Sequence, residues 1–348
     1  MSNKRKTPDH TVSKIKELRR KEMSVSELTK GIFAGDKTLL AKGITLLESS
    51  NPIHFEKANE VIQKCLSKPT KSVRIGITGV PGVGKSSFIE VFGKTLTNQG
   101  KKVAVLAVDP TSTLSKGSIL GDKTRMERLS KDPHAFIRPT PSGDSLGGVA
   151  RKTRESIILC EAAGFDVILV ETVGVGQSET VVHSMVDFFL LLKLSGAGDE
   201  LQGIKRGIME MADAIAINKA DGHNIEKAKL AEREFTRALH LYPPKENGWT
   251  PKVLRCSAME NIGILEIWEL IEGFSKHTTK NGHFEQHRKI QNKNWFLQTL
   301  DEQLKHLFYQ RKNYKTKIES LLTEIEANKI SPYFAAKTLL MDIHQELK

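Results

Sequence analysis

A phosphate-binding loop placed between a strand pattern and a helix pattern constrains the fold of this chain more than any other feature. Residues 79–86 read Gly-Val-Pro-Gly-Val-Gly-Lys-Ser and match every position of the motif G-x-x-x-x-G-K-S/T. The segment 74–78 before the loop, within the apolar run 73–80, predicts a strand that leads into it. After the loop, apolar residues repeat at helical spacing at Phe88, Ile89, Phe92 and Leu96. Strand, glycine-rich loop and helix in this order predict a nucleotide-binding α/β domain.

The residue types in this loop suit the chemistry of phosphate binding. Glycines let the backbone curl so that successive N–H groups face phosphate oxygens, and the next helix directs its positive end at the same anion. Lys85 is expected to bridge the β- and γ-phosphates, and the Ser86 hydroxyl to ligate Mg²⁺. We expect the nucleotide to contact the whole loop and the serine that follows it, which reaches the α-phosphate: Gly79, Val80, Pro81, Gly82, Val83, Gly84, Lys85, Ser86 and Ser87.

The middle of the chain repeats the alternation of short apolar runs and longer helical patterns. The runs lie at residues 73–80, 103–108, 167–170, 188–194, 212–217 and 253–256. Several are rich in Val, Ile and Leu without polar alternation, which is typical of parallel strands covered on both faces. The segments between them are long enough for crossover helices. We therefore expect a doubly wound, mostly parallel α/β sheet, in a P-loop domain over residues 71–275.

Helical patterns flank this domain on both sides. An N-terminal helical extension is predicted over residues 1–70, where Ser24 and Glu27 resemble a capping box. A C-terminal helical arm is predicted over residues 283–348. Its last helix opens at Ser331 and Pro332, a cap followed by a first-turn proline. The apolar stripes of this arm suit packing on its own domain and packing on a second copy equally well.

The base specificity of the site is predicted by an N-K-x-D element, Asn218 to Asp221, directly after the run 212–217. The Asp221 carboxylate is expected to accept from guanine N1–H and the 2-amino group together, whereas adenine would leave this carboxylate unpaired, which is costly. The Lys219 stem should lie along the base, and Asn218 should tie this loop to the phosphate loop. A backbone N–H of a later loop should meet the base oxygen, at Ser257, Ala258 and Met259. The expected ligands are GTP and GDP.

A carboxylate at the end of the run 167–170 is the first candidate for the magnesium site. Glu171 begins Glu-Thr-Val-Gly, which occupies the place of the D-x-x-G element, so its carboxylate would hold Mg²⁺ directly or through water. The Gly174 N–H would sense the γ-phosphate. Gln177 is the candidate for orienting water, but it is three residues beyond Gly174 instead of adjacent to it. We therefore predict slow intrinsic GTP hydrolysis without a partner.

Two further acids are candidates for the metal or the reaction. Asp109 follows the run 103–108, and the carboxyl ends of parallel strands are where such sheets bind ligands. Asp122 lies in the segment Gly-Asp-Lys-Thr-Arg. The competing interpretations are a turn-forming Asp-Pro pair for Asp109 and a solvated loop acid for Asp122.

Composition excludes several classes of protein. No run of 18 apolar residues is present, so no membrane-spanning helix is expected. The three cysteines are far apart and not in C-x-x-C pairs, which favours reduced thiols in the cytoplasm over disulfides or a zinc ribbon. The net charge of +12 is concentrated in residues 1–24 and 276–348. Without an RNA-binding signature or interleaved aromatic residues, this charge favours a solvated helical surface over binding of nucleic acid or membrane.

Taken together, these motifs resemble the MeaB/ArgK-like GTPases, relatives of the methylmalonic aciduria type A protein. The matching segments are residues 79–87, 108–110, 118–126, 171–179, 196–207 and 218–221. The segment 196–205, Gly-Ala-Gly-Asp-Glu-Leu-Gln-Gly-Ile-Lys, is the most distinctive of them. The resemblance covers residues 20 to 330, although Ser195 stands where the family commonly has proline.

This resemblance implies a function and an assembly. Family members belong to the dimerising (SIMIBI-type) branch of P-loop proteins and chaperone adenosylcobalamin-dependent acyl-CoA mutases, such as methylmalonyl-CoA mutase. They gate cobalamin delivery and release, protect the mutase, and form homodimers through C-terminal helices. Residues 199–205 are similar to an extra switch that couples nucleotide state to the partner. The candidate catalytic residues implied are Lys85, Asp109, Glu171, Gln177 and Lys205.

Three other functions remain as alternatives at this stage. A nickel-type metallochaperone GTPase would need a Cys/His site near the nucleotide, which Cys160 and His183 alone do not make. A nucleic-acid-binding regulator would show steep salt dependence of binding through its basic ends. A small-molecule kinase would transfer phosphate to a substrate instead of water.

Overall fold

The structure, a computed structural model, describes residues 23–49, 51–108, 126–140, 146–172, 178–196, 206–310 and 312–346. The chain divides into two compact units, residues 1–288 and 289–348. The three predicted domains remain a prediction. Among the residues described, no helix has the length and apolar character needed to cross a membrane.

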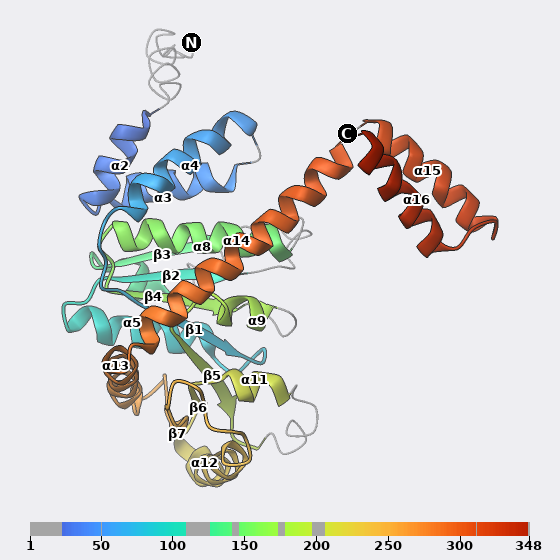
Figure 1. Cartoon of the computed structure of the whole chain (residues 1–348). Helices are drawn as coiled ribbons and strands as arrows, with labels where there is room; N and C mark the ends of the chain where they lie inside the picture. The colour runs from blue at the N-terminus through green and yellow to red at the C-terminus, as the bar shows by residue number, and fades with distance from the viewer. Residues whose placement is uncertain are drawn as a thin grey trace, which may run out of the picture. The chain divides into compact units, whose positions relative to one another are not determined.

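Helices and strands alternate through most of the chain (Figure 1). The strands are β1 Val73–Gly79, β2 Val103–Val108, β3 Ala135–Thr140, β4 Val167–Thr172, β5 Phe188–Leu194, β6 Ala214–Asn218 and β7 Lys252–Arg255. The helices of the first part are α2 Val25–Phe33, α3 Lys37–Glu48, α4 Pro52–Leu66, α5 Lys85–Asn98, α7 Glu127–Ser130, α8 Leu146–Ala162 and α9 Ser178–His183. Those of the second part are α11 Arg206–Met211, the 3₁₀ turn Gly222–Asn224, α12 Ile225–Leu239, α13 Ile264–Lys280, α14 His283–Gln310, α15 Lys312–Glu326 and α16 Pro332–Glu346.

The described strands form one seven-stranded sheet in the order β3-β2-β4-β1-β5-β6-β7, and every pair is parallel. This confirms the doubly wound α/β prediction. Strand β3 is missing from the predicted runs. It pairs only with β2 and so forms an edge, where Arg138 and Pro139 are tolerated because one side of the strand needs no partner.

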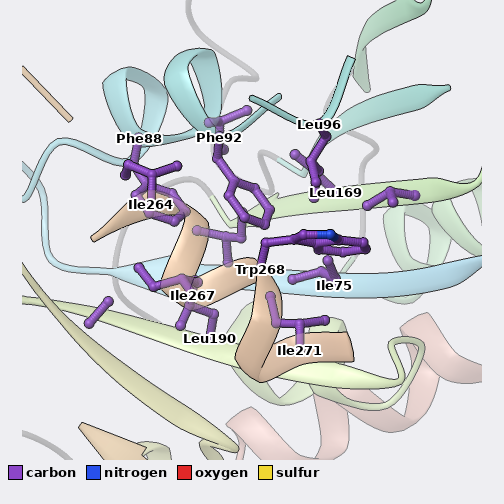
Figure 2. Packing of buried hydrophobic residues seen from close by; sticks show 14 of the residues in the cluster. Ile75, Phe88, Phe92, Leu96, Leu169, Leu190, Ile264, Ile267, Trp268 and Ile271 are labelled. Carbon is purple, nitrogen blue, oxygen red and sulfur yellow. The ribbon is translucent and has the colours of Figure 1, made fainter. Parts of the chain in front are cut away.

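The core lies on both faces of the sheet. On one face, α5 and α13 pack against the central strands, with the Phe92 and Trp268 rings meeting edge to face at 6.3 Å (Figure 2). On the other face, α11 and α12 cover β5 and β6 in a second cluster that includes Phe235. The three cysteines are free and buried, as expected, and burial raises the pKa of the Cys256 thiol to about 12.

Three aspartates fix the amino-terminal edge of the sheet. Asp166, Asp187 and Asp213 each precede a strand, and each carboxylate accepts a backbone N–H at or just before the start of a neighbouring strand. The donors are the amides of Lys102, Arg74 and Phe189, at 2.8, 2.8 and 2.9 Å. These bonds satisfy backbone N–H groups at the strand starts and help to set which strands are neighbours.

The N-terminal helices belong to the first unit. Helix α2 begins with the predicted capping box, in which the Glu27 N–H donates to the Ser24 hydroxyl and the Glu27 carboxylate accepts from the Ser24 N–H. Helices α2, α3 and α4 pack on α8. Arg138 of β3 forms an ion pair with Glu48 of α3, which links this extension to the sheet edge. In the second unit, α16 begins at Pro332 as predicted, with the Phe334 N–H donating to the Ser331 hydroxyl at 3.2 Å.

Candidate nucleotide site

The phosphate loop joins the end of β1 to the start of α5. Gly84 caps α5 in the left-handed region, with φ 92° and ψ 32°, a conformation that favours glycine. A Cβ on Gly84 would also lie 2.8 Å from the Asn218 side-chain amide. A Cβ on Gly79 would lie 2.6 Å from the Leu192 carbonyl oxygen of β5. The glycines at these two positions are therefore required by the backbone itself, beside their proposed role in phosphate binding.

Lys85 lies in the first turn of α5, and its ammonium faces back over the loop. Its Nζ donates to the Gly79 carbonyl oxygen at 2.7 Å and to that of Val80 at 3.4 Å. Burial lowers the Lys85 pKa, while the nearby Glu171 and Glu179 carboxylates raise it. The ammonium is thus held among groups that a phosphate can replace, since a polyphosphate supplies negative charge and acceptors together.

The N-K-x-D element lies beside the phosphate loop although the two are far apart in sequence. The Asn218 side-chain amide donates to the Val83 carbonyl oxygen at 2.8 Å, across 135 residues. The Lys219 ammonium donates to the Gly82 carbonyl oxygen at 2.8 Å. Lys219 adopts a positive φ of 58°, which directs this turn out of β6. Both loops follow the carboxyl ends of parallel strands, the edge at which such sheets bind ligands.

The loop after β7 completes this group. The Ser257 hydroxyl donates to the Asp221 carboxylate, and the Ala220 N–H donates to the Cys256 carbonyl oxygen at 3.0 Å. Ser257 is fully buried, whereas Met259 is 91% exposed. The structure therefore brings Asn218, Lys219 and Asp221 together with Ser257, and it leaves Met259 at the surface. Ala258, between Ser257 and Met259, is partly buried against the core.

Glu171 and Ser86 form a pair of hard oxygen donors at the same edge. Glu171 is the next-to-last residue of β4, beside β1, is 4% exposed, and accepts from the Ser86 hydroxyl at 3.3 Å. A carboxylate and a hydroxyl suit Mg²⁺, which prefers oxygen ligands and keeps phosphate and water in its remaining positions. No group of three or more His, Cys, Asp or Glu side chains in the described residues could hold a metal alone. A magnesium ion shared with a nucleotide fits this donor set.

Five predicted site residues lie outside the residues that the structure describes: Asp109, Asp122, Gly174, Gln177 and Lys205. Their assignments remain predictions from the sequence.

One acidic residue near the loop had no predicted role. Glu179 lies in the first turn of α9, is 2% exposed, and is close enough to Lys85 to raise its pKa. It lies in the segment 171–179 that carried the resemblance, but a single acid eight residues after Glu171 matches no general nucleotide motif.

A hydrogen bond between side chains also joins strands β4 and β1 near the loop. The buried Thr172 hydroxyl donates to the Thr78 hydroxyl at 2.9 Å.

Comparison with known proteins identifies the family of this chain. The family described as "Methylmalonyl Co-A mutase-associated GTPase MeaB" matches residues 40–313. The chain belongs to the MeaB family. GTPase ArgK of Escherichia coli is 45% identical to it over 312 residues, covering 89% of this chain and 94% of ArgK.

Other relatives of this MeaB-family protein agree. A probable GTPase of Mycobacterium tuberculosis is 45% identical over 317 residues, covering 91% of this chain and 94% of its own. The mitochondrial methylmalonic aciduria type A homolog of Mus musculus is 43% identical, covering 91% of this chain and 79% of its own. A crystal structure titled LAO/AO transport system kinase superposes with a TM-score of 0.74 at 37% identity, covering 92% and 97% of the two chains.

These relatives and the phosphate loop establish the activity. The protein is a P-loop GTPase that binds guanine nucleotides. Its family is associated with methylmalonyl-CoA mutase.

Proposed function

We propose that this MeaB-family GTPase is a chaperone of an adenosylcobalamin-dependent acyl-CoA mutase of the methylmalonyl-CoA mutase type. The observation that carries the proposal is the family match over residues 40–313, whose description names such a mutase as the associated enzyme. The nucleotide state of the GTPase gates cobalamin delivery and release and protects the mutase. The free, buried cysteines are consistent with a cytoplasmic setting.

Different residues of the described site bind the phosphates, the metal ion and the base of GTP. Lys85 neutralises the β- and γ-phosphates, which it approaches from its present position over the loop. Ser86 and Glu171 would hold Mg²⁺, which neutralises phosphate charge when bound. Asp221 reads the guanine edge while the Ser257 hydroxyl fixes its carboxylate. Asn218 holds the base loop and the phosphate loop in register through Val83.

Partner control of hydrolysis gives the first testable prediction. Lys205 belongs to the segment similar to the extra switch of the family, and the position of Gln177 predicts slow intrinsic hydrolysis. Lys205→Ala is expected to leave basal phosphate release within about twofold and to lower mutase-stimulated release by at least about tenfold, the scale of one lost electrostatic contact. Phosphate release is measured with and without the mutase. Equal loss of both rates would contradict a coupling role for Lys205.

Self-association through the C-terminal helices gives the second prediction. In the second unit, an apolar groove of about 520 Å³ runs between α15, α16 and the end of α14. Leu304 and Leu340 line it and are 55% and 59% exposed, an apolar surface that a second copy would cover. Leu304→Asp with Leu340→Asp is expected to convert a homodimer to monomer in light scattering after gel filtration. The exposed Leu241→Asp variant is the control and should remain dimeric.

The experiment that tests the mutase partnership is a pull-down from the native host. The purified GTPase is loaded with GDP or with a non-hydrolysable GTP analogue, and bound proteins are identified. Nucleotide-dependent capture of an acyl-CoA mutase is the expected result. Capture of a nickel enzyme instead, or no dependence on nucleotide, would overturn the proposed client.

A further inference from the structure

Glu179 is a buried carboxylate near the phosphate loop that has no part in the proposed GTP site. It lies in the first turn of α9, is 2% exposed, and belongs to neither the phosphate loop nor the proposed magnesium site. A charged group is costly to bury unless nearby groups of opposite charge or hydrogen bonds compensate for the lost water. The position of Glu179 relative to the bound phosphates therefore indicates what its charge does.

The packing of α9 on the sheet places Glu179 toward the phosphate loop. Helix α9 approaches β1 closely at Gly76, where a Cβ would lie 3.0 Å from methyl carbons of both Val182 and Val186. Helix α9 connects the carboxyl end of β4 to the amino end of β5, and both strands are parallel to β1, so α9 runs antiparallel to β1. Glu179 precedes Val182 by three residues, which places it on the same helix face and about 4.5 Å nearer the carboxyl edge of the sheet. The phosphate loop starts from this edge.

The sheet surface that leads from α9 to the phosphate loop is polar. Thr78 of β1 is buried on the face that α9 covers, since it lies two residues after Gly76. The Thr172 hydroxyl of β4 donates to the Thr78 hydroxyl at 2.9 Å. The Lys85 ammonium donates to the carbonyl oxygen of the next residue of β1 at 2.7 Å. In agreement with this arrangement, burial lowers the Lys85 pKa, and the Glu179 carboxylate is one of two that oppose the lowering.

The two carboxylates near Lys85 differ in what a bound nucleotide does to them. Glu171 accepts from the Ser86 hydroxyl and belongs to the proposed magnesium site, so a bound ion would offset its charge. Glu179 lies on α9, outside that pair of metal donors. GTP has one phosphate more than GDP and therefore brings more negative charge to Lys85. A fixed carboxylate nearby repels this additional charge, and the repulsion is strongest where little water screens it.

We propose that Glu179 is a specificity-determining residue that weakens GTP binding relative to GDP binding, by placing a negative charge where the γ-phosphate approaches Lys85. The inference rests on the proposed contact of Lys85 with the β- and γ-phosphates. GDP is affected less because it lacks the γ-phosphate. A site balanced in this way binds the two nucleotides with more similar affinities. A partner protein then needs less interaction energy to shift the site between its GTP and GDP states.

The test measures the affinity of the full chain for GDP and for a non-hydrolysable GTP analogue, by titration with Mg²⁺ present. Glu179→Gln removes the charge and keeps the size of the side chain. We expect the ratio of analogue affinity to GDP affinity to rise by about three- to tenfold in this variant. Glu179→Asp keeps the charge and should change the ratio by less than about twofold. An effect on Lys85 itself reaches both nucleotides, since both have a β-phosphate, and so largely cancels in the ratio.

Glu161→Gln is the matched control, because Glu161 is also a buried glutamate, 7% exposed, but pairs with Arg74 at the amino end of β1. Its ratio should equal that of the unsubstituted protein. Glu179→Met, also uncharged, has the same expected ratio as Glu179→Gln and replaces it if that variant does not fold.

An unchanged or lowered ratio in Glu179→Gln would overturn the proposal. So would an equal change in Glu179→Asp, which would indicate altered packing instead of lost charge. If Lys85→Ala binds GTP normally, the phosphate contact itself is wrong. If only the ratio is unchanged in Glu179→Gln, the phosphate contact stands and the role of Glu179 alone is wrong.

Discussion

Lys85→Ala is expected to weaken GTP and GDP binding by about 30-fold or more while leaving the nucleotide-free protein folded. The Lys85 ammonium lies over the loop and donates to the backbone carbonyl oxygens of Gly79 and Val80, at 2.7 and 3.4 Å. In the complex it would contact phosphate in a site with little water. Truncating one partner of such a buried charged contact costs about 2–5 kcal/mol, and about 1.4 kcal/mol corresponds to tenfold in affinity. A loss of about 30-fold to more than 1,000-fold is therefore expected in fluorescent-nucleotide titration.

The control for this variant removes a lysine of similar size elsewhere. Lys64 lies on α4 in an exposed ion pair with Glu60, which contributes little to stability. Lys64→Ala should bind GTP normally. Because burial already lowers the Lys85 pKa, its removal should change the free energy of unfolding without nucleotide by less than about 1 kcal/mol. GTP affinity within threefold of the unsubstituted protein would contradict the phosphate role of Lys85.

Asp221→Asn should convert the guanine preference into a xanthine preference. The Asp221 carboxylate pairs with N1–H and the 2-amino group of guanine, whereas an asparagine amide would donate to the 2-oxo group of xanthine. Hydrogen bonds to charged groups contribute about 1.5–3 kcal/mol, so GTP should bind about 10- to 100-fold more weakly. XTP should gain affinity correspondingly. Competition of GTP, XTP and ATP against a fluorescent analogue measures this shift.

The structure explains why this substitution can change the base without disrupting the loop. The Ser257 hydroxyl donates to Asp221, and an asparagine carbonyl oxygen can accept the same bond. Asp221→Ala lacks any acceptor and should lose GTP without gaining XTP. Asp301→Asn, an exposed position on α14, is the charge-matched control. Unchanged GTP affinity in Asp221→Ala would rule out the assignment of the base-reading carboxylate.

Much of the sheet could be predicted because its strands are buried on both faces. Strand β2 consists of Val, Ala and Leu, and β4 begins with four Val, Ile and Leu residues, as expected for strands that are buried along their whole length. Strand β3 escaped prediction because an edge strand pairs on one side alone and so accepts Arg138 and Pro139. The helix caps at Ser24 and Ser331 could also be predicted, because a cap involves residues only a few positions apart in the sequence.

The contacts that assemble the candidate site were harder to foresee. The Asn218 bond to Val83 follows from the order of the motifs. By contrast, the closeness of the Leu192 carbonyl oxygen, which lies 2.6 Å from where a Cβ on Gly79 would be, depends on which strands are neighbours. Glu179 gave no sequence signal because its burial near Lys85 is set by the packing of α9 on β1 and β4. Three-dimensional packing, not local pattern, determines these contacts.

The lining of a cavity of about 530 Å³ at the amino-terminal edge of the sheet shows the same limit. His183 of α9 and His283 and His287 of α14 line this cavity, yet they are 100 residues or more apart in the sequence, and no spacing rule joins them. They line the same cavity because α9 leads into β5 and because Arg288 holds the start of α14 to Asp187. Long-range ion pairs of this kind place residues that the sequence pattern leaves separate.

Purine selectivity of phosphate release tests the central claim most directly. The purified protein is given GTP or ATP with Mg²⁺ at equal concentration, and phosphate release is followed with binding measured in parallel. We predict tight GTP and GDP binding, slow release of phosphate from GTP, and at least about 100-fold weaker binding of ATP. Tight binding of ATP with none of GTP, or binding of neither, would contradict the account in which residues 79–86 bind the phosphates and Asp221 recognises guanine.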